Sequence, residues 1–107
     1  MSIKDERTVS LLREMAAEFF KREPVSKALL TVTRVTLSTD RGLATIYFTV
    51  FPDSSEQETL KASLRKRSDF RDFVEKNSKL GKIPFFEFAV DLGEKNRQKI
   101  DNLSQQK

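Results

Sequence analysis

The cations between residues 61 and 82 are the part of the chain whose side chains could bind a ligand directly. This stretch holds eight lysines and arginines against three acids, a charge of +5, while the whole 107-residue chain carries +4. The rest of the chain therefore sums to −1. Such concentrated positive charge favours a polyanion such as nucleic acid as the partner. The residues expected to contact phosphates are Arg65, Lys66, Arg67, Arg71, Lys76, Lys79 and Lys82.

Two further cations, Lys4 and Arg7, lie in a predicted N-terminal helix and are also candidate RNA contacts. The alternative for all of these side chains is a solvated helix face, because charged outer faces are common on the helices of globular proteins. In that case Asp69 and Asp72 would form local ion pairs with neighbouring arginines. The two interpretations differ in whether ligand binding depends on the cations.

Catalytic chemistry is poorly supported by the composition. The chain has no cysteine and no histidine, so it lacks a thiol nucleophile, the commonest zinc ligand and the usual base at neutral pH. Asp40, Asp53 and Glu56 are predicted in turns, with neither metal-site nor dyad spacing. We therefore expect no enzyme activity, no metal and no cofactor. No apolar run approaches the ~20 residues of a membrane-spanning helix, so we expect a soluble, cytoplasmic monomer.

The first predicted element is a helix. Apolar residues recur every three or four positions between residues 9 and 20, which is the period of an amphipathic helix. The predicted helix runs from about Ile3 to Arg22. Pro24 ends it, because the residue before a proline avoids helical backbone angles.

A predicted β-hairpin follows the first helix. Residues 30–37 and 43–51 alternate in the manner of strands, and the turn "STDRG" at 38–42 joins them. The alternation changes phase between Thr33 and Arg34. This change predicts a β-bulge or a twisted edge in the first of two antiparallel strands.

The next stretch is "LKASLRKRSDFRDFVEKNSKLGKIP". Its apolar residues have helical spacing at both ends, but the two sets do not lie on the same face of one helix. In one straight helix Phe73 would point about 180° away from Leu64, and one of the two would face solvent. A break lets both side chains reach the core. We therefore predict two helices with a kink at Arg67, Ser68 and Asp69, and Ser68 or Asp69 as the cap of the second helix.

The last predicted strand covers residues 85–91, so the order of elements is helix, strand, strand, helix, helix, strand. This order predicts an α+β fold in which helices cover one face of a three-stranded sheet. It is the order of a type II KH domain, which clamps single-stranded RNA with a Gly-x-x-Gly loop between two helices. The glycines here are Gly42, Gly81 and Gly93, so that loop is absent.

We predict a single KH-like RNA-binding domain over residues 1–91. Residues 92–107 are expected to form a short C-terminal extension. A weak helix at 94–103 would dock through Ile100 and Leu103, and the rest of the tail would be disordered.

The hairpin sequence "LTVTRVTLSTDRGLATIYFTVF" resembles that of the ribosome-binding factor A family, whose strand pair reads T-V-T-x-V, S-x-D, then alanine followed by Val or Ile and Tyr. "RTV" at 7–9 and "IPFFEFAVD" at 83–91 are similar to further family motifs. The resemblance covers about residues 5–103. The matching hairpin residues are Thr31, Val32, Thr33, Val35, Ser38, Asp40, Ala44, Ile46 and Tyr47.

The resemblance implies a non-catalytic assembly factor that binds the free small ribosomal subunit and its rRNA late in maturation, notably in the cold, with other assembly factors as candidate partners. Family members have an Ala-x-Gly kink between the two helices. Depending on the placement of one gap, the family kink falls on Lys66, Arg67 and Ser68 or on Arg67, Ser68 and Asp69. Neither set contains alanine or glycine. The alternative function is a protein-protein interaction module of KH-like fold that uses its sheet or the 85–88 edge and makes no direct RNA contact.

Overall fold

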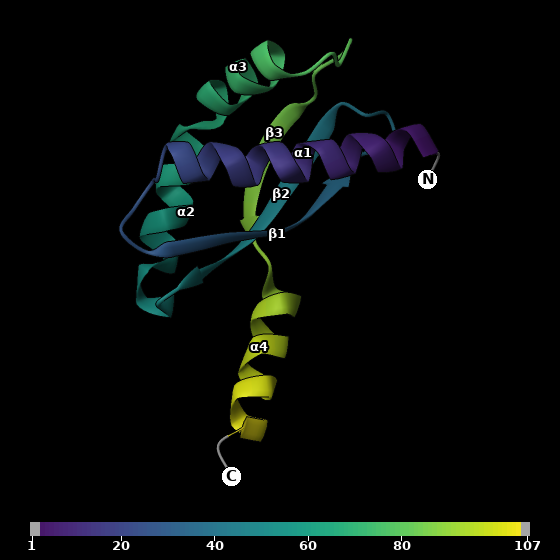
Figure 1. Ribbon diagram of the computed structural model, residues 1–107. Coiled ribbons are helices and arrows are strands. Elements are labelled where there is room, and N and C mark those ends of the chain that lie inside the picture. Colours follow the sequence, from purple (N-terminus) through teal and green to yellow (C-terminus); the bar gives the residue numbers. More distant parts are fainter. Residues whose placement is uncertain (1–2, 106–107) are drawn as a thin grey trace.

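The computed structural model describes the backbone of residues 3–105 and the side chains of residues 5–100. Its three strands form one sheet with the order β1-β2-β3. Figure 1 shows the elements, which are α1 (Ile3–Arg22), β1 (Leu29–Leu37), β2 (Leu43–Phe51), the 3-10 helix η1 (Asp53–Ser55), α2 (Glu56–Arg65), α3 (Arg67–Asn77), β3 (Phe85–Val90) and α4 (Leu92–Gln105).

The central strand β2 pairs with β1 antiparallel and with β3 parallel. The predicted hairpin is therefore confirmed. The register between β1 and β2 shifts between Val32 and Arg34, which places the predicted bulge at Thr33. A parallel pair needs a crossover connection, and α2 and α3 supply it between β2 and β3. The predicted α+β order is confirmed.

Aromatic side chains join the helices to the sheet in the core. Phe70 of α3 is fully buried, and its ring centroid lies 5.3 Å from that of Phe19 and 4.7 Å from that of Phe86. Phe20 of α1 lies 5.2 Å from Phe88 of β3. The rings meet edge to face or tilted, the geometry that aromatic pairs prefer. One cluster therefore holds α1, α3 and β3 together.

The helical stretch after η1 is two helices, as its phase predicts. Lys66 alone separates α2 from α3. Its backbone N–H donates to the Ser63 carbonyl over 2.9 Å, and its carbonyl accepts from the Phe70 N–H over 2.9 Å. The chain therefore changes direction at one residue, as the different courses of α2 and α3 in Figure 1 show, with its hydrogen bonds largely kept.

The kink lies at Lys66, which is within the alternative placement at Lys66, Arg67 and Ser68 but one residue before the placement at Arg67, Ser68 and Asp69. The predicted capping was wrong. Arg67, Ser68 and Asp69 all lie within α3, and no side chain caps its N-terminus. Lys66 has φ −97° and ψ 8°, a turn conformation open to residues other than glycine. Because φ is negative there, the kink forms without a glycine.

Asp91 ties the bulge of β1 to the start of α4. Its buried carboxylate accepts hydrogen bonds from Thr33 Oγ1 at 2.6 Å and from Arg34 Nε at 3.2 Å. The other oxygen accepts from the Glu94 N–H at 3.1 Å and so caps α4. Burial raises the pKa of Asp91, but these hydrogen bonds and the Arg34 charge outweigh it and lower the pKa overall.

The C-terminal extension is more helical than predicted. In place of a helix at 94–103 followed by a disordered tail, α4 begins directly after Asp91 and continues to Gln105. The cap from Asp91 and a longer run of helical residues account for the difference. Residues 106 and 107 lie outside the described part of the chain.

The predicted docking of this helix through Ile100 was wrong. The side chain of Ile100 is 63% exposed, and that of Leu103 lies outside the described residues. α4 projects away from the sheet in Figure 1. Its first turns are held by polar contacts instead, since Lys95 Nζ lies 2.9 Å from Glu56 Oε2 and this pair raises the pKa of Lys95.

Replacing Asp91 by asparagine should lower the free energy of unfolding by roughly 1 to 3 kcal/mol at neutral pH, because charge-assisted hydrogen bonds to a buried carboxylate are lost. The folded-state pKa of Asp91 is lowered, so its contribution is complete above the unfolded value of about 3.9 and disappears as pH falls through the folded value. Urea unfolding should show that the free energies of unfolding of the variant and the unchanged protein differ at pH 7 and approach each other in acid. Asp72→Asn, an exposed change, is the control. A difference that is independent of pH would contradict this role.

Placing glycine at the kink should destabilise the protein. Lys66→Gly is expected to lower the free energy of unfolding by roughly 0.4 to 1 kcal/mol relative to Lys66→Ala, because glycine adds freedom to the unfolded chain and φ at this position is already negative. Comparing these two variants removes the effect of the lost lysine side chain. A more stable glycine variant would show that the kink is strained.

Candidate nucleic-acid interface

A cleft of about 340 Å³ lies where the start of α3 faces β3. β3 pairs only with β2 among the described strands, so its other edge is open beside this cleft. The kink at Lys66 is adjacent, because α3 starts with the next residue. The cleft is lined by Arg67, Ser68, Arg71, Phe85, Phe86 and Glu87.

Two of the predicted RNA contacts lie in this cleft and also hold it together. Arg67 Nε donates to the Leu64 carbonyl over 3.0 Å, and its Nη1 forms an ion pair with the Glu87 carboxylate. Arg71 Nη1 donates to the carbonyls of Ile83 and Pro84 over 3.2 and 3.0 Å. Arg67 and Arg71 therefore attach α3 to β3 and to the segment before it.

The other two cations at the kink differ in their environment. Lys66 Nζ lies 3.5 Å from an oxygen of Asp69 and 4.0 Å from one of Glu23. Arg65 is exposed, and among the described side chains it has no ion pair. The kink thus presents one uncompensated arginine and two cations that already have acidic partners.

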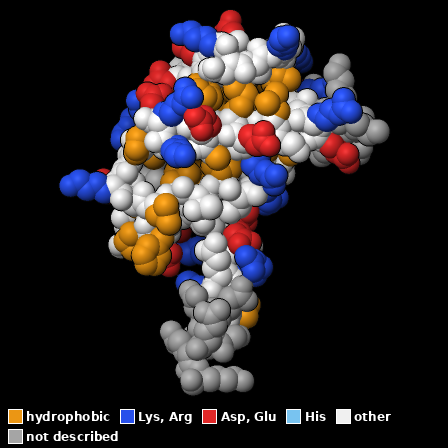
Figure 2. Space-filling model, viewed as in Figure 1, with side chains coloured by type: hydrophobic (Ala, Val, Ile, Leu, Met, Phe, Trp, Pro, Cys, Tyr) orange, Lys and Arg blue, Asp and Glu red, His pale blue; other side chains and the backbone are white. Residues whose placement is uncertain are grey.

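The remaining predicted cations of the basic segment lie at the far end of α3. The helix has eleven residues and is therefore about 16 Å long. Lys76 is in its last turn, and Lys79 and Lys82 follow in the connection to β3. All three side chains are exposed. On the face shown in Figure 2, cations and acids alternate, and no single blue patch covers it.

Lys82 approaches the turn between β1 and β2. Both Lys82 and Asp40 line a hollow of about 220 Å³. The Asp40 carboxylate accepts from the Gly42 N–H at 2.9 Å and from Ser38 Oγ at 2.7 Å. The pKa of Asp40 is lowered, most by the Gly42 N–H, then by Ser38, with a smaller effect of the Lys82 charge. The turn therefore carries an anion beside Lys82.

The two predicted contacts in α1 are not part of the cleft. Arg7 is exposed and lines a separate hollow with Glu6 and Glu14. Lys4 lies outside the residues whose side chains are described. The structure therefore places Arg7 away from the cleft and leaves the position of the Lys4 side chain outside the described residues.

Phe85 is a candidate contact that the charge pattern does not reveal. Its side chain is 75% exposed at the cleft, and the guanidinium carbon of Arg71 lies 5.6 Å from its ring centroid. Exposed aromatic rings stack on unpaired bases, and a neighbouring arginine adds to such sites. The sequence signal is the position of Phe85 out of phase with the core residues Phe86 and Phe88. In the alternative function, the 85–88 edge containing Phe85 binds a protein.

Other kinds of site are not evident. Within residues whose side chains the structure describes, no cluster of three or more acids forms a potential metal site. No helix in the described range is long and apolar enough to cross a bilayer.

Two helices joined by a kink, beside the parallel edge strand of a three-stranded sheet, define the class of type II KH-like proteins. The model of the family "Ribosome-binding factor A" matches residues 4–104. The chain belongs to the ribosome-binding factor A family.

Similar proteins include two that are described as ribosome-binding factor A. The chain is 32% identical to that of Chlorobium phaeobacteroides strain BS1 over 99% of this chain and 95% of the relative. It is 31% identical to that of Chlorobaculum parvum over 96% of this chain and 89% of the relative.

The fold is similar to solved structures from thermophiles. The crystal structure of ribosome-binding factor A from Thermus thermophilus superposes with a TM-score of 0.72 at 24% identity, covering 80% of this chain and 93% of that one. The solution structure of a Thermotoga maritima protein described as a putative ribosome binding factor A gives the same TM-score and identity, with 87% and 92% coverage. These similarities confirm the predicted KH-like fold.

Removing Arg71 should weaken the fold more than removing Arg65. Arg71→Ala is expected to lower the free energy of unfolding by roughly 1 to 3 kcal/mol, because charge-assisted hydrogen bonds to two backbone carbonyls are lost. Arg65→Ala should change it by less than about 0.5 kcal/mol, as for other exposed side chains. Denaturant titrations of the two variants make the comparison. Equal effects would mean that Arg71 does not position β3.

Proposed function

We propose that the protein is a ribosome assembly factor that binds the small ribosomal subunit through its rRNA and catalyses no reaction. The observation that carries the proposal is the cleft beside the kink, where an exposed aromatic ring and arginines lie together. Similarity to a homology model of Thermus thermophilus ribosome binding factor A supports it, because that model was fitted into a cryo-EM map of a 30S-RbfA complex. The TM-score is 0.62 at 24% identity, covering 76% of this chain and 88% of that one.

In this proposal Phe85 stacks on an unpaired base and Arg65 binds a phosphate next to it. Lys66 and Arg67 exchange their exposed acidic partners for phosphates, since exposed ion pairs contribute little to stability. Arg71 keeps its carbonyl contacts and adds positive charge to the cleft. The outer contacts are Lys76 in α3, Lys79 and Lys82 in the connection to β3, and Lys4 and Arg7 on α1.

The finer aspects of the proposal concern when and where the factor acts. It would act during late rRNA processing and in cold adaptation, as a cytoplasmic monomer, with other assembly factors as further partners. Residues 1–91 would be the RNA-binding domain. Residues 92–107 would be an extension that begins at the Asp91 cap.

Charge reversal at Arg65 should weaken binding to purified small subunits without unfolding the protein, because this side chain is exposed and unpaired in the described structure. If about five phosphates are neutralised, the logarithm of affinity should fall with the logarithm of salt concentration with a slope of roughly −3.5 to −4.5. Arg65→Glu should make this slope shallower by about 1. Lys99→Glu, the same change in charge on exposed α4, is the matched control. Sedimentation with free subunits at several salt concentrations measures the affinity and its salt dependence for both variants.

Two results would contradict the proposal. One is binding that does not depend on salt or on Arg65. The other is an association with subunit particles that survives digestion of the RNA, which would favour the protein-protein interaction module instead.

A further inference from the structure

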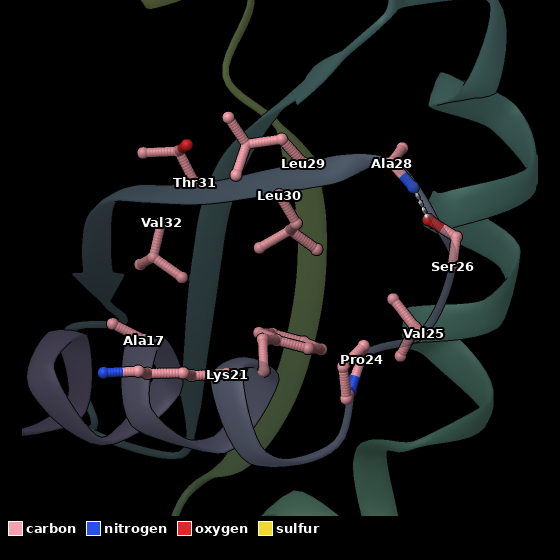
Figure 3. A pocket seen from close by; sticks show the side chains of 11 residues that line it. Ala17, Lys21, Pro24, Val25, Ser26, Ala28, Leu29, Leu30, Thr31 and Val32 are labelled. Atoms are coloured by element: carbon pink, nitrogen blue, oxygen red, sulfur yellow. Dashed lines mark hydrogen bonds between the residues drawn. The ribbon is translucent and has the colours of Figure 1, made fainter.

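The C-terminal half of α1 and the first half of β1 enclose an apolar groove of about 410 Å³. Figure 3 shows Leu30 and Val32 pointing from β1 toward α1, where Ala17 and Lys21 face them. The side chains of Leu29 and Thr31, which alternate with them, point to the other side of β1 in the same view. The volume of the groove is within the range of ligand pockets.

One wall of this groove is an unprotected strand edge. β1 pairs only with β2 among the described strands, so alternate residues of β1 turn backbone N–H and C=O groups away from the sheet. Natural sheets usually protect such edges with charged residues, proline or a bulge. Residues 29–32 read Leu-Leu-Thr-Val, and the bulge and the first charge come only at Thr33 and Arg34. This part of the edge is therefore open to another strand.

The rim of the groove carries positive charge. Lys21 is the only charged residue that lines it, and Lys27 is exposed between the lining residues Ser26 and Ala28. Neither lysine has an ion pair among the described side chains. The nearest acids in the sequence, Glu18 and Glu23, have Arg22 and Lys66 as partners. An acidic residue in a bound segment would compensate this charge.

We propose that the groove binds an extended, apolar and acidic segment of another protein, which adds to β1 as a fourth strand. The backbone of the segment would pair with residues 29–32, and its alternate apolar side chains would enter the groove toward α1. An Asp or Glu at one end would meet Lys21. The groove lies at the β1 edge and the cleft at the β3 edge, so this site is independent of the RNA interface.

The test uses the full chain and a phage-displayed library of random peptides of about eight residues, the length of an ordinary strand. Selected peptides should alternate apolar residues and carry Asp or Glu. A synthetic copy of an enriched peptide should bind, as measured by fluorescence anisotropy. It should also slow hydrogen exchange at the amides of residues 29–32, because these would pair with the peptide.

Matched variants locate the site. Ala17→Arg places a long side chain in the groove from an exposed helix position and should weaken binding at least about tenfold. Ser10→Arg makes the same change in charge on α1 outside the groove and should leave binding unchanged. Lys21→Glu should weaken binding, and a peptide with lysine in place of its acid should restore it.

Several outcomes would overturn the proposal. They are a selection without enriched peptides, binding that Ala17→Arg does not affect, and protection of β3 in place of β1. A free protein that forms dimers with residues 29–32 already protected would also overturn it, because a second copy of the chain would then occupy the edge.

Discussion

The single-residue kink at Lys66 is the constraint on which the rest of the structure depends. In a straight helix Phe73 would lie about 180° from Leu64, and the second half of the helix would turn its apolar face away from the core. The kink rotates α3 so that Phe70 is fully buried against Phe19 and Phe86. Because β3 contributes Phe86, the same rotation determines where β3 packs and hence where the cleft forms.

The cations around the kink serve the fold and a ligand to different degrees. Arg71 binds two backbone carbonyls just before β3, and Arg67 reaches Glu87 across the cleft. Arg65 has no such partner among the described residues and is free to meet a phosphate. The cations of this segment are therefore not equivalent. A cation that already has a partner within the protein is less available to a ligand than one that has none.

The two edges of the sheet have different chemistry. At the β3 edge an exposed ring and arginines surround a small cleft, which suits a base and its phosphates. At the β1 edge an apolar groove lies beside a strand that carries no charge before Arg34, which suits a polypeptide. The central strand β2 separates these edges, so ligands at the two edges need not compete.

The sequence by itself determined the elements, the existence of the kink and the family, because periodicity, turn residues and local motifs reflect burial and backbone geometry over short stretches. It misplaced the kink by one residue and chose Ser68 or Asp69 as a cap, since several neighbouring residues could have made the turn. Only the tertiary structure decided that Asp91 binds Thr33, 58 positions earlier, and that Phe85 lies in the cleft. Contacts of this kind depend on strand order and register, and no local pattern records them.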